Sequence, residues 1–231
     1  MRPLHPRLSI RPAEHDTRAV VLVLHGGKEH SYESSEPGHL SSRRVNPFAR
    51  ALHRRGAPHG VAVWKVRYRV RGWNAPERSP VADARWALEE VRRVHGDVPV
   101  VLLGHSMGGR AAAHVLDDPS VIAMVALCPW LPDEPIHGVS GKQVLIAHAV
   151  GDNWTSPAES VAWAAAARPL ATSLTYVRVQ RTGHFMLRRS RLWTDLAVGF
   201  PLSWLDLDPS VGRRATNVLA QAATGAPLLT V

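Results

Sequence analysis

A short glycine-flanked serine motif carries the clearest chemistry in this 231-residue chain. Residues 104–108 (GHSMG) have the form G-x-S-x-G, follow the apolar run Val98–Leu103, and precede a stretch of small residues with helical character. A sharp turn between a strand and a helix holds such a serine in a strained conformation, and the glycines leave room for close packing. This context predicts that Ser106 is a nucleophile. The alternative is a glycine-rich turn whose serine only caps the helix.

A serine nucleophile needs a base near neutral pH, usually a histidine that a carboxylate orients. Of the thirteen histidines, His184 is favoured because it follows the expected strand Ser173–Val179. Asp152 follows the expected strand Gln143–Ala147 and is the candidate orienting carboxylate. Both lie, like Ser106, at C-terminal ends of strands, where open α/β sheets place their sites. The alternatives are a surface-loop histidine and an aspartate that only stabilises a turn.

Two backbone N–H groups are candidates for stabilising an oxyanion. Residues 25–27 (HGG) follow the first strong apolar run and form the type of turn that supplies one such donor. We expect Gly27 to be this donor, with Lys28 as second choice, and Met107 to supply the other. One such donor typically contributes roughly 3–4 kcal/mol of transition-state stabilisation. We expect His25 to hydrogen-bond the loop backbone and to take no part in catalysis.

The elements that position these residues alternate along the chain. Continuous apolar runs of strand length indicate strands that are covered on both faces. The expected strands are Leu8–Ile10, Ala19–Leu24, Val61–Arg69, Val98–Leu103, Val121–Leu127, Gln143–Ala147 and Ser173–Val179. The expected helices are Asn46–Arg55, Ser79–His95, Met107–Leu116, Ser156–Ala167 and Arg188–Leu205, the last with a break near Pro201. This alternation predicts an α/β fold with a mostly parallel sheet flanked by helices.

Length and composition fit one globular domain over residues 1–231, with 45% hydrophobic and 20% charged residues. We expect a core of about residues 8–205 and a C-terminal tail, residues 206–231, whose structure the pattern does not assign. The single cysteine, Cys128, excludes an intrachain disulfide. No apolar window reaches the length of a membrane span, and residues 1–12 lack the apolar stretch of a secretory signal. We therefore expect a cytoplasmic protein without a membrane partner.

The charge is strongly positive, with 28 Lys and Arg against 19 Asp and Glu and a net charge of +9. Such a balance raises the question of a nucleic-acid partner. The arginines are dispersed along the chain and belong to no recognisable nucleic-acid-binding module, so we expect solvated surface charge and no nucleic acid. The one functional interpretation that we retain is electrostatic steering of anionic esters or thioesters, such as acyl-CoA.

With segments 25–27, 104–108, 151–152 and 183–184 in this order, the chain resembles a serine hydrolase of the α/β-hydrolase family. The resemblance runs from about residue 19 to 205 and is specific for the superfamily, not for a substrate. It implies a mostly parallel sheet of about seven to eight strands. It also implies acyl-enzyme chemistry by Ser106, Asp152 and His184 without a cofactor.

Two departures from the family pattern matter. Many members insert a helical cap, but only Cys128–Lys142 separates the two strands here, so no cap domain fits. The site should be fairly open, roofed by His30–Arg43 and Pro129–His137, and the size is that of a dienelactone-hydrolase-like protein. The motif also resembles that of bacterial lipases and cutinases. Those are secreted and usually disulfide-bonded, which argues against that subgroup.

Other side chains have weaker claims to function. Loop tryptophans Trp73, Trp130 and Trp154, together with Lys28, either line a substrate pocket or pack within loops. Arg110 is expected to be a solvated helix arginine, and Cys128 a small buried hydrophobe. We expect no metal site, because His105 and His114 form no convincing ligand spacing with a third residue.

The sequence therefore predicts a carboxylesterase or thioesterase (class EC 3.1) that acts on a small acyl ester or thioester. The alternatives are acyl transfer, amide hydrolysis or cofactor-free peroxidation by the same triad, and a catalytically silent ligand-binding protein. Acyl length, leaving group and oligomeric state do not follow from the sequence.

Overall fold

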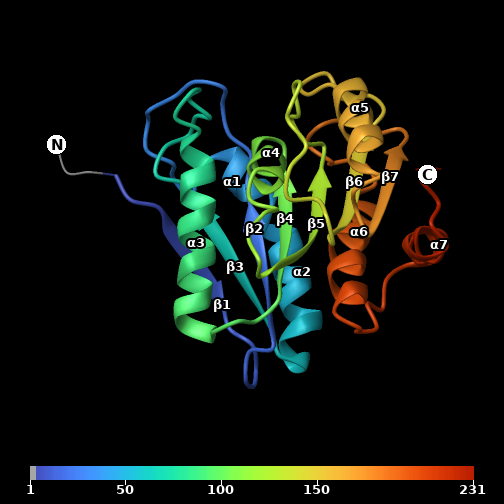
Figure 1. Ribbon diagram of the computed structural model, residues 1–231. Helices are drawn as coiled ribbons and strands as arrows, with labels where there is room; N and C mark the ends of the chain where they lie inside the picture. Colours follow the sequence, from blue (N-terminus) through green and yellow to red (C-terminus); the bar gives the residue numbers. More distant parts are fainter. Residues whose placement is uncertain (1–3) are drawn as a thin grey trace.

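A mostly parallel sheet forms the centre of the computed structural model, which describes residues 4–231. Within these residues the sheet has eight strands in the order β1-β3-β2-β4-β5-β6-β7-β8 (Figure 1). β1 pairs with β3 in the antiparallel sense, and the other neighbouring strands are parallel. The strands are β1 (Arg7–Arg11), β2 (Ala19–Leu24), β3 (Val61–Arg67), β4 (Val100–His105), β5 (Val121–Leu127), β6 (Gln143–Ala149), β7 (Ser173–Val179) and β8 (Leu228–Thr230). Residues 1–12 lack the apolar stretch of a secretory signal, and the first three of them lie outside the described residues.

Helices cover both faces of the sheet (Figure 1). Their bounds are α1 (Leu40–Arg44), α2 (Asn46–Gly56), α3 (Ser79–His95), α4 (Met107–Ala113), α5 (Pro157–Ala167), α6 (Ser190–Trp204) and α7 (Arg213–Ala223), with a 3₁₀ turn at Ala57–His59. Helices α2, α6 and α7 contribute to one hydrophobic core, and α3, α4 and α5 contribute to the other. The α/β architecture expected from the sequence is therefore confirmed.

The two cores follow from the strand sequences. All six residues of β2 are buried. Because successive side chains of a strand point to opposite faces, Val21 and Val23 enter one core, whereas Val20, Leu22 and Leu24 enter the other. The continuous apolar run is thus what a strand between two helical layers requires.

The C-terminal tail, which the sequence pattern leaves unassigned, contains α7 and β8. β8 pairs with β7 at the edge of the sheet, and Ala215 and Val218 of α7 are buried. Helix α6 continues through Pro201, where a break was expected. Leu196, Phe200 and Leu202 are at most 2% exposed, so core packing offsets the hydrogen bond that the proline removes.

No cap domain separates β5 from β6, as the sequence predicts. The connection, residues 128–142, contains turns and an isolated bridge between Ser140 and Ala171, without a helix. None of the helices within residues 4–231 combines the length and the hydropathy needed to cross a bilayer.

Candidate active site

The candidate site residues follow β2, β4, β6 and β7, which end at one edge of the sheet because they run parallel. Gly27 follows β2, Ser106 follows β4, Asp152 follows β6 and His184 follows β7. The topology thus gathers residues from four distant parts of the chain, in the position where open α/β sheets place ligands.

Ser106 lies in the turn between β4 and α4 with a φ of 56° and a ψ of −123°. A non-glycine residue adopts positive φ only where the surrounding structure holds it there. Its backbone N–H donates to the Leu127 carbonyl (3.1 Å), and its own carbonyl accepts from the Gly109 N–H (2.9 Å). A Cβ atom on Gly108 would overlap the Leu24 carbonyl, so the start of α4 packs directly on the end of β2. A Cβ atom on Gly104 would in turn overlap the Gly108 carbonyl, so both glycines of the motif are needed for this close packing.

Asp152 and His184 form the closest polar pair of the site. His184 Nδ1 lies 2.8 Å from Asp152 Oδ2, and both side chains are buried. The other carboxylate oxygen, Oδ1, accepts from the backbone N–H groups of Trp154 (2.8 Å) and Thr155 (3.0 Å). The structure therefore brings together the two residues that the sequence pairs.

The hydrogen bonds around Asp152 keep it ionised. Burial alone raises the pKa of this carboxyl group, because it disfavours the charged form. Hydrogen bonds from His148, His184 and the backbone outweigh burial and hold the pKa of Asp152 well below its usual range. A fixed negative charge beside His184 can orient one imidazole tautomer and stabilise its cation.

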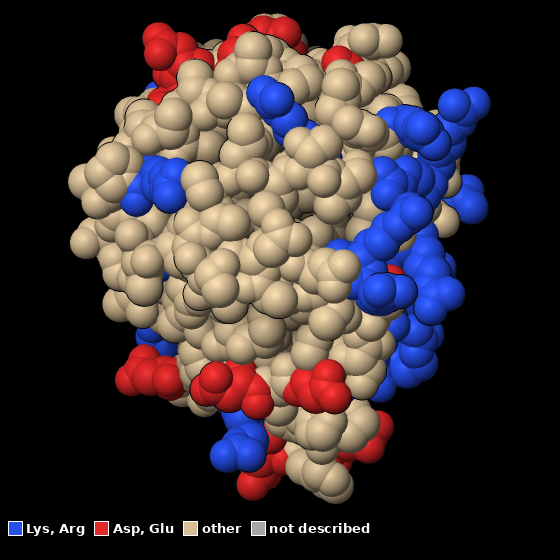
Figure 2. All heavy atoms as spheres, turned by 90° about the vertical axis from the view of Figure 1, so that its right-hand side faces the viewer, with Lys and Arg blue, Asp and Glu red and all other residues tan. Residues whose placement is uncertain are grey.

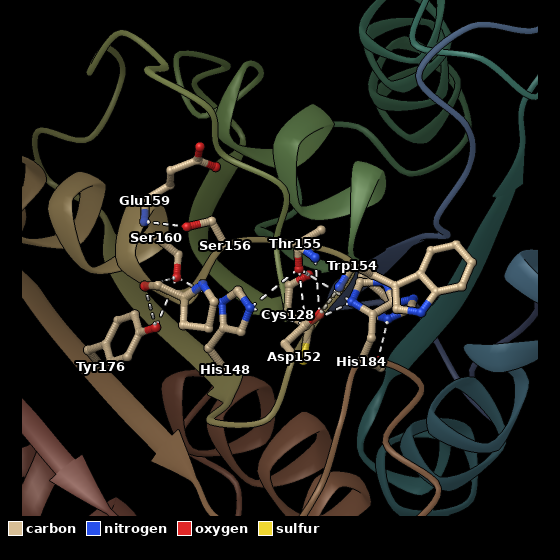
Figure 3. A network of polar contacts seen from close by, with 12 residues as sticks. Cys128, His148, Asp152, Trp154, Thr155, Ser156, Glu159, Ser160, Tyr176 and His184 are labelled. Atoms are coloured by element: carbon tan, nitrogen blue, oxygen red, sulfur yellow. Dashed lines mark hydrogen bonds and ion pairs between the residues drawn. The ribbon is translucent and has the colours of Figure 1, made fainter.

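A second histidine shares this carboxylate, which sequence reasoning missed (Figure 3). His148 Nε2 lies 3.2 Å from Asp152 Oδ2, and His148 Nδ1 lies 2.7 Å from Ser160 Oγ. Ser160 Oγ in turn lies 2.9 Å from the Tyr176 hydroxyl. These hydrogen bonds are all made when Tyr176 donates to Ser160, Ser160 donates to His148 Nδ1, and His148 Nε2 donates to Asp152. One signal was available: His148 is a polar residue inside the apolar strand β6, four positions before Asp152.

Ser106 and His184 are linked through their immediate neighbours. The His105 ring lies 4.9 Å from the His184 ring, centroid to centroid, and His105 Nε2 lies 3.2 Å from the His184 carbonyl oxygen. Burial lowers the pKa of His105 to about 3, so this ring is neutral. Within residues 4–231, the hydrogen bonds of the His184 ring involve Nδ1, and none joins Nε2 to the Ser106 hydroxyl. Such bonds often form only when substrate is bound.

The loop after β2 lies beside the nucleophile turn. A Cβ atom on Gly27 would overlap the Met107 side chain and the Arg71 carbonyl. The Lys28 N–H already donates to that carbonyl (2.8 Å), which removes the second-choice oxyanion donor. Met107 is the first residue of α4, and its N–H therefore has no partner within the helix. Gly27 and Met107 remain the two candidate donors.

His25 bonds to the loop backbone, as expected from the sequence. Its Nδ1 lies 2.6 Å from the Gly26 carbonyl, and its ring packs against Tyr68 at 4.6 Å between centroids. Burial lowers the pKa of His25 to about 4, so the ring is neutral at physiological pH.

Of the suggested pocket residues, Trp154 lies beside His184. Its indole stacks beside the His184 ring at 6.2 Å and 20°, contacts Phe185, and is 73% exposed (Figure 3). These three residues border a hollow of about 340 Å³. Trp73, by contrast, is 1% exposed and lies inside the fold. The Lys28 side chain is half exposed and pairs with Glu33 at 3.8 Å.

Arg110 is not the solvated helix residue that we expected. Its guanidinium lies 4.1 Å from the Trp73 ring centroid and 4.3 Å from that of Trp130, and it forms an ion pair with Glu134. Glu134 also contacts His114 Nε2 (2.5 Å). Trp130 therefore packs on Arg110, and this cluster ties the 129–137 segment to α4.

The site also contains a donor set that could hold a metal ion. Ligand atoms of Cys128, Asp152 and His184 lie within 4.8 Å of one another, and all three residues are buried. The sequence did not suggest this set. Asp152 and His184 already bind each other directly, and burial raises the pKa of the Cys128 thiol well above its usual value, which disfavours the thiolate that metals bind.

Comparison with solved structures supports the same fold. A lid-less α/β serine hydrolase from Xanthomonas campestris has a TM-score of 0.67 at 19% identity, covering 86% of this chain and 89% of that one. An esterase from Thermogutta terrifontis, solved with propionate, has a TM-score of 0.64 at 19% identity, covering 87% and 88%. Est1E from Butyrivibrio proteoclasticus, solved with ferulic acid, has a TM-score of 0.65 at 14% identity, covering 87% and 96%. At such identities these structures show a common fold.

No curated protein sequence matches the chain. The sequence of residues 15–154, however, matches the family described as serine aminopeptidase, S33. The matched region is more than half of the chain and contains the HGG turn, the nucleophile turn and Asp152, whereas His184 lies beyond it. The chain therefore belongs to the serine aminopeptidase S33 family and has the fold of an α/β hydrolase without a lid.

Proposed function

We propose that this protein hydrolyses a carboxylic ester or thioester through an acyl-enzyme, with Ser106 as nucleophile, His184 as base and Asp152 as the orienting carboxylate. The observation that carries the proposal is the 2.8 Å contact between Asp152 Oδ2 and His184 Nδ1, at the sheet edge where Ser106 has a φ of 56°. A buried carboxylate–imidazole pair beside a strained serine is the arrangement that activates a hydroxyl group.

In the first half of the reaction, His184 Nε2 removes the Ser106 proton while Oγ attacks the carbonyl carbon. The carbonyl oxygen becomes an oxyanion, which the N–H groups of Gly27 and Met107 stabilise. Asp152 keeps the Nδ1–H tautomer of His184 and stabilises the imidazolium. The tetrahedral intermediate then collapses: the bond to the alcohol or thiol breaks, and His184 returns its proton to the leaving group.

In the second half, a water molecule takes the place of the alcohol or thiol. His184 removes one proton from this water as its oxygen attacks the acyl carbon, and the same two N–H groups hold the second oxyanion. The bond to Ser106 Oγ breaks, and the proton on His184 passes to that oxygen. The carboxylic acid leaves and Ser106 is restored.

The surroundings of the site suit an ester with an acyl or aromatic group. Trp154 and Phe185, which flank His184, offer an apolar rim for such a group. Two of the nearby carboxylates are already engaged: Glu134 is bound to Arg110 and His114, and Glu33 is bound to Arg71 and Lys28.

Covalent labelling tests the assignment directly. We expect a fluorophosphonate probe to modify the wild-type protein once, at Ser106, and p-nitrophenyl acetate to be turned over. Ser106→Ala should lose labelling and at least about 1,000-fold in kcat. Ser9→Ala, which changes an exposed serine of β1, is the matched control and should behave as wild type.

The same experiment can overturn the proposal. If the folded wild-type protein is neither labelled at Ser106 nor active on any ester of an acyl-length series, the chain is a ligand-binding member of the fold. Turnover of an amino-acid p-nitroanilide in preference to esters would replace the ester assignment by amide hydrolysis.

A further inference from the structure

A strongly basic groove lies at the β7–β8 end of the sheet, away from the residues of the proposed reaction. Its volume is about 630 Å³, within the range of small-molecule sites. Three arginines line it: Arg181 in the loop after β7, Arg189 just before α6, and Arg214 in the first turn of α7. Figure 2 faces this end of the molecule and shows Lys and Arg side chains gathered in a column along one side.

No Asp or Glu side chain among residues 4–231 forms an ion pair with these three guanidinium groups, although many other arginines of the chain are paired. The acidic group that borders the groove is the terminal carboxylate of Val231, which pairs with none of the three within 4.0 Å. Burial, with smaller contributions from the charges of Arg214 and Arg181, lowers the pKa of Arg189. Three arginines that line one groove and form no ion pair with an Asp or Glu indicate a place for an anion.

Helix α7 and the end of β7 supply neutral hydrogen-bonding groups to the groove. Arg214, Asn217 and Gln221 are spaced by three and four residues, so they share one face of α7. Gln180 lies opposite, and its carbonyl accepts a hydrogen bond from Arg189 Nη1 (3.2 Å). Amide side chains beside several arginines suit a phosphorylated group that also carries polar atoms, such as a nucleotide.

The loop that forms this groove also carries His184. Arg181 is three residues before His184 and Arg189 is five residues after it, so their Cα atoms lie within about 11 Å and 18 Å of that of His184. Arg181 and Arg189 both have a φ of 57°, which non-glycine residues adopt rarely. One loop thus carries both the proposed base and two of the three arginines, so a substrate bound by its phosphate in the groove is held within this range of His184.

Resting on the proposed function, we infer that the substrate is an ester or thioester whose leaving group carries phosphate, and that Arg181, Arg189 and Arg214 bind this phosphate. This assignment names a substrate class for the proposed reaction. It also gives a local role to part of the +9 charge of the chain.

Kinetics on matched substrates test the inference. Acetyl-CoA carries nucleotide phosphates, acetyl-phosphopantetheine carries one terminal phosphate, and acetyl-N-acetylcysteamine carries none. We expect kcat/KM to be higher for the two charged thioesters, and the ranking of these two identifies whether the nucleotide or a single phosphate is recognised. The double variant Arg181→Gln/Arg214→Gln should lower kcat/KM for the preferred thioester about 10-fold or more through KM, and should leave the uncharged thioester unchanged.

The control variant is Arg7→Gln/Arg11→Gln, which removes the same charge from β1 at the opposite edge of the sheet. It should leave kcat/KM unchanged for all three thioesters. The preference for charged thioesters should weaken at high ionic strength, because salt screens exposed charges. An equal fall in kcat/KM for the preferred thioester in the two double variants would overturn the inference. So would equal kcat/KM for charged and uncharged thioesters in the wild-type protein.

A binding measurement separates this inference from the proposed function. ADP and inorganic pyrophosphate should bind to Ser106→Ala and lose at least about 10-fold in affinity when Arg181→Gln/Arg214→Gln is added. If the anions bind in this way but no ester is hydrolysed, the proposed function fails and the anion site stands. If esters are hydrolysed but neither anion binds, the anion site fails and the proposed function stands.

Discussion

His148 Nε2 lies 3.2 Å from Asp152 Oδ2, so one buried carboxylate oxygen contacts the imidazole rings of both His148 and His184. His148 is 1% exposed and is anchored on its other nitrogen by Ser160. The arrangement extends the pair of Asp152 and His184 by a second, rigid support. It is built largely from one short segment, because the strand end β6 carries His148 and the following turn carries Asp152.

Replacing His148 by Asn should therefore reduce catalysis without abolishing it. A hydrogen bond to a charged group contributes about 1.5–3 kcal/mol, and part of this loss should appear in the barrier because Asp152 is less firmly oriented. We expect kcat on p-nitrophenyl acetate to fall about 10-fold with KM unchanged, per fluorophosphonate-titrated site. Ser160→Ala keeps the Nε2 contact and should have a smaller effect. A normal kcat per titrated site in His148→Asn would show that the residue only supports the fold.

Gly27→Ala tests the oxyanion loop. The new Cβ atom would overlap the Met107 side chain and the Arg71 carbonyl, so the loop that carries the Gly27 N–H must shift. We expect kcat to fall about 100-fold, the order of magnitude for losing one oxyanion donor. Gly38→Ala is the matched control, since a Cβ there meets nothing within 4 Å. Activity within about twofold of wild type in Gly27→Ala would remove Gly27 from the mechanism.

The protein should lose stability as the pH falls below about 6.5. Burial lowers the pKa of His25 to about 4 and that of His105 to about 3, so the unfolded chain binds more protons between these values and 6.5. Stability is full above 6.5 and decreases by roughly 2 kcal/mol per histidine on going to pH 5. The depressed pKa of Asp152 adds nothing to this window, because its contribution is lost only below about pH 4.

Urea unfolding at pH 7 and pH 5 checks this pH dependence. His25→Gln should reduce the difference in the free energy of unfolding between the two pH values. His59→Gln, at an exposed position, should not reduce it. Equal wild-type stability at both pH values would contradict the prediction.

Removing metal ions should leave the activity intact. His184 Nδ1 contacts Asp152 Oδ2 directly at 2.8 Å, so these atoms are engaged in the hydrogen bond that the proposed mechanism uses. After dialysis against EDTA we expect kcat/KM to stay within about twofold of the untreated protein. A loss that added Zn²⁺ restores would instead assign Cys128, Asp152 and His184 as metal ligands.

The sequence predicts the elements well where apolar runs dictate them, and poorly where packing decides. Buried strands such as β2 and β5 have the predicted bounds, because a strand covered on both faces must be apolar throughout. The tail helix α7 and β8 were not assigned, since a three-residue edge strand leaves almost no periodic signal. Helix α6 passes through Pro201 because its packing outweighs local preference.

For the candidate site, motif context and chain order predict that Ser106, Asp152 and His184 lie at one edge of the sheet. His148 and Arg110 were not predicted to interact there. The partner of Arg110, Glu134, is distant in sequence, and the contact of His148 with nearby Asp152 depends on the turn that follows β6, so both contacts exist only in the folded structure. A titratable residue inside an apolar strand, such as His148, is nevertheless a pattern that merits attention in sequences of this type.

Arg110 should not be replaceable by lysine. Its planar guanidinium lies against the rings of both Trp73 and Trp130 and pairs with Glu134, and a lysine cannot reproduce that geometry. We expect Arg110→Lys to lower the free energy of unfolding by about 1–2 kcal/mol. Arg93→Lys, which changes an exposed pair with Glu90, should be nearly neutral because such pairs contribute little.

The Arg110 variant should also affect the site, since Glu134 lies in the 129–137 segment and the Trp130 N–H donates to the Ser106 carbonyl (3.2 Å). Loosening this segment should therefore weaken the positioning of the nucleophile turn as well as the fold. We expect a lower kcat per titrated Ser106 in Arg110→Lys and not in Arg93→Lys. If Arg110→Lys lost stability but kept full activity per titrated site, the Arg110 cluster would support the fold independently of the reaction.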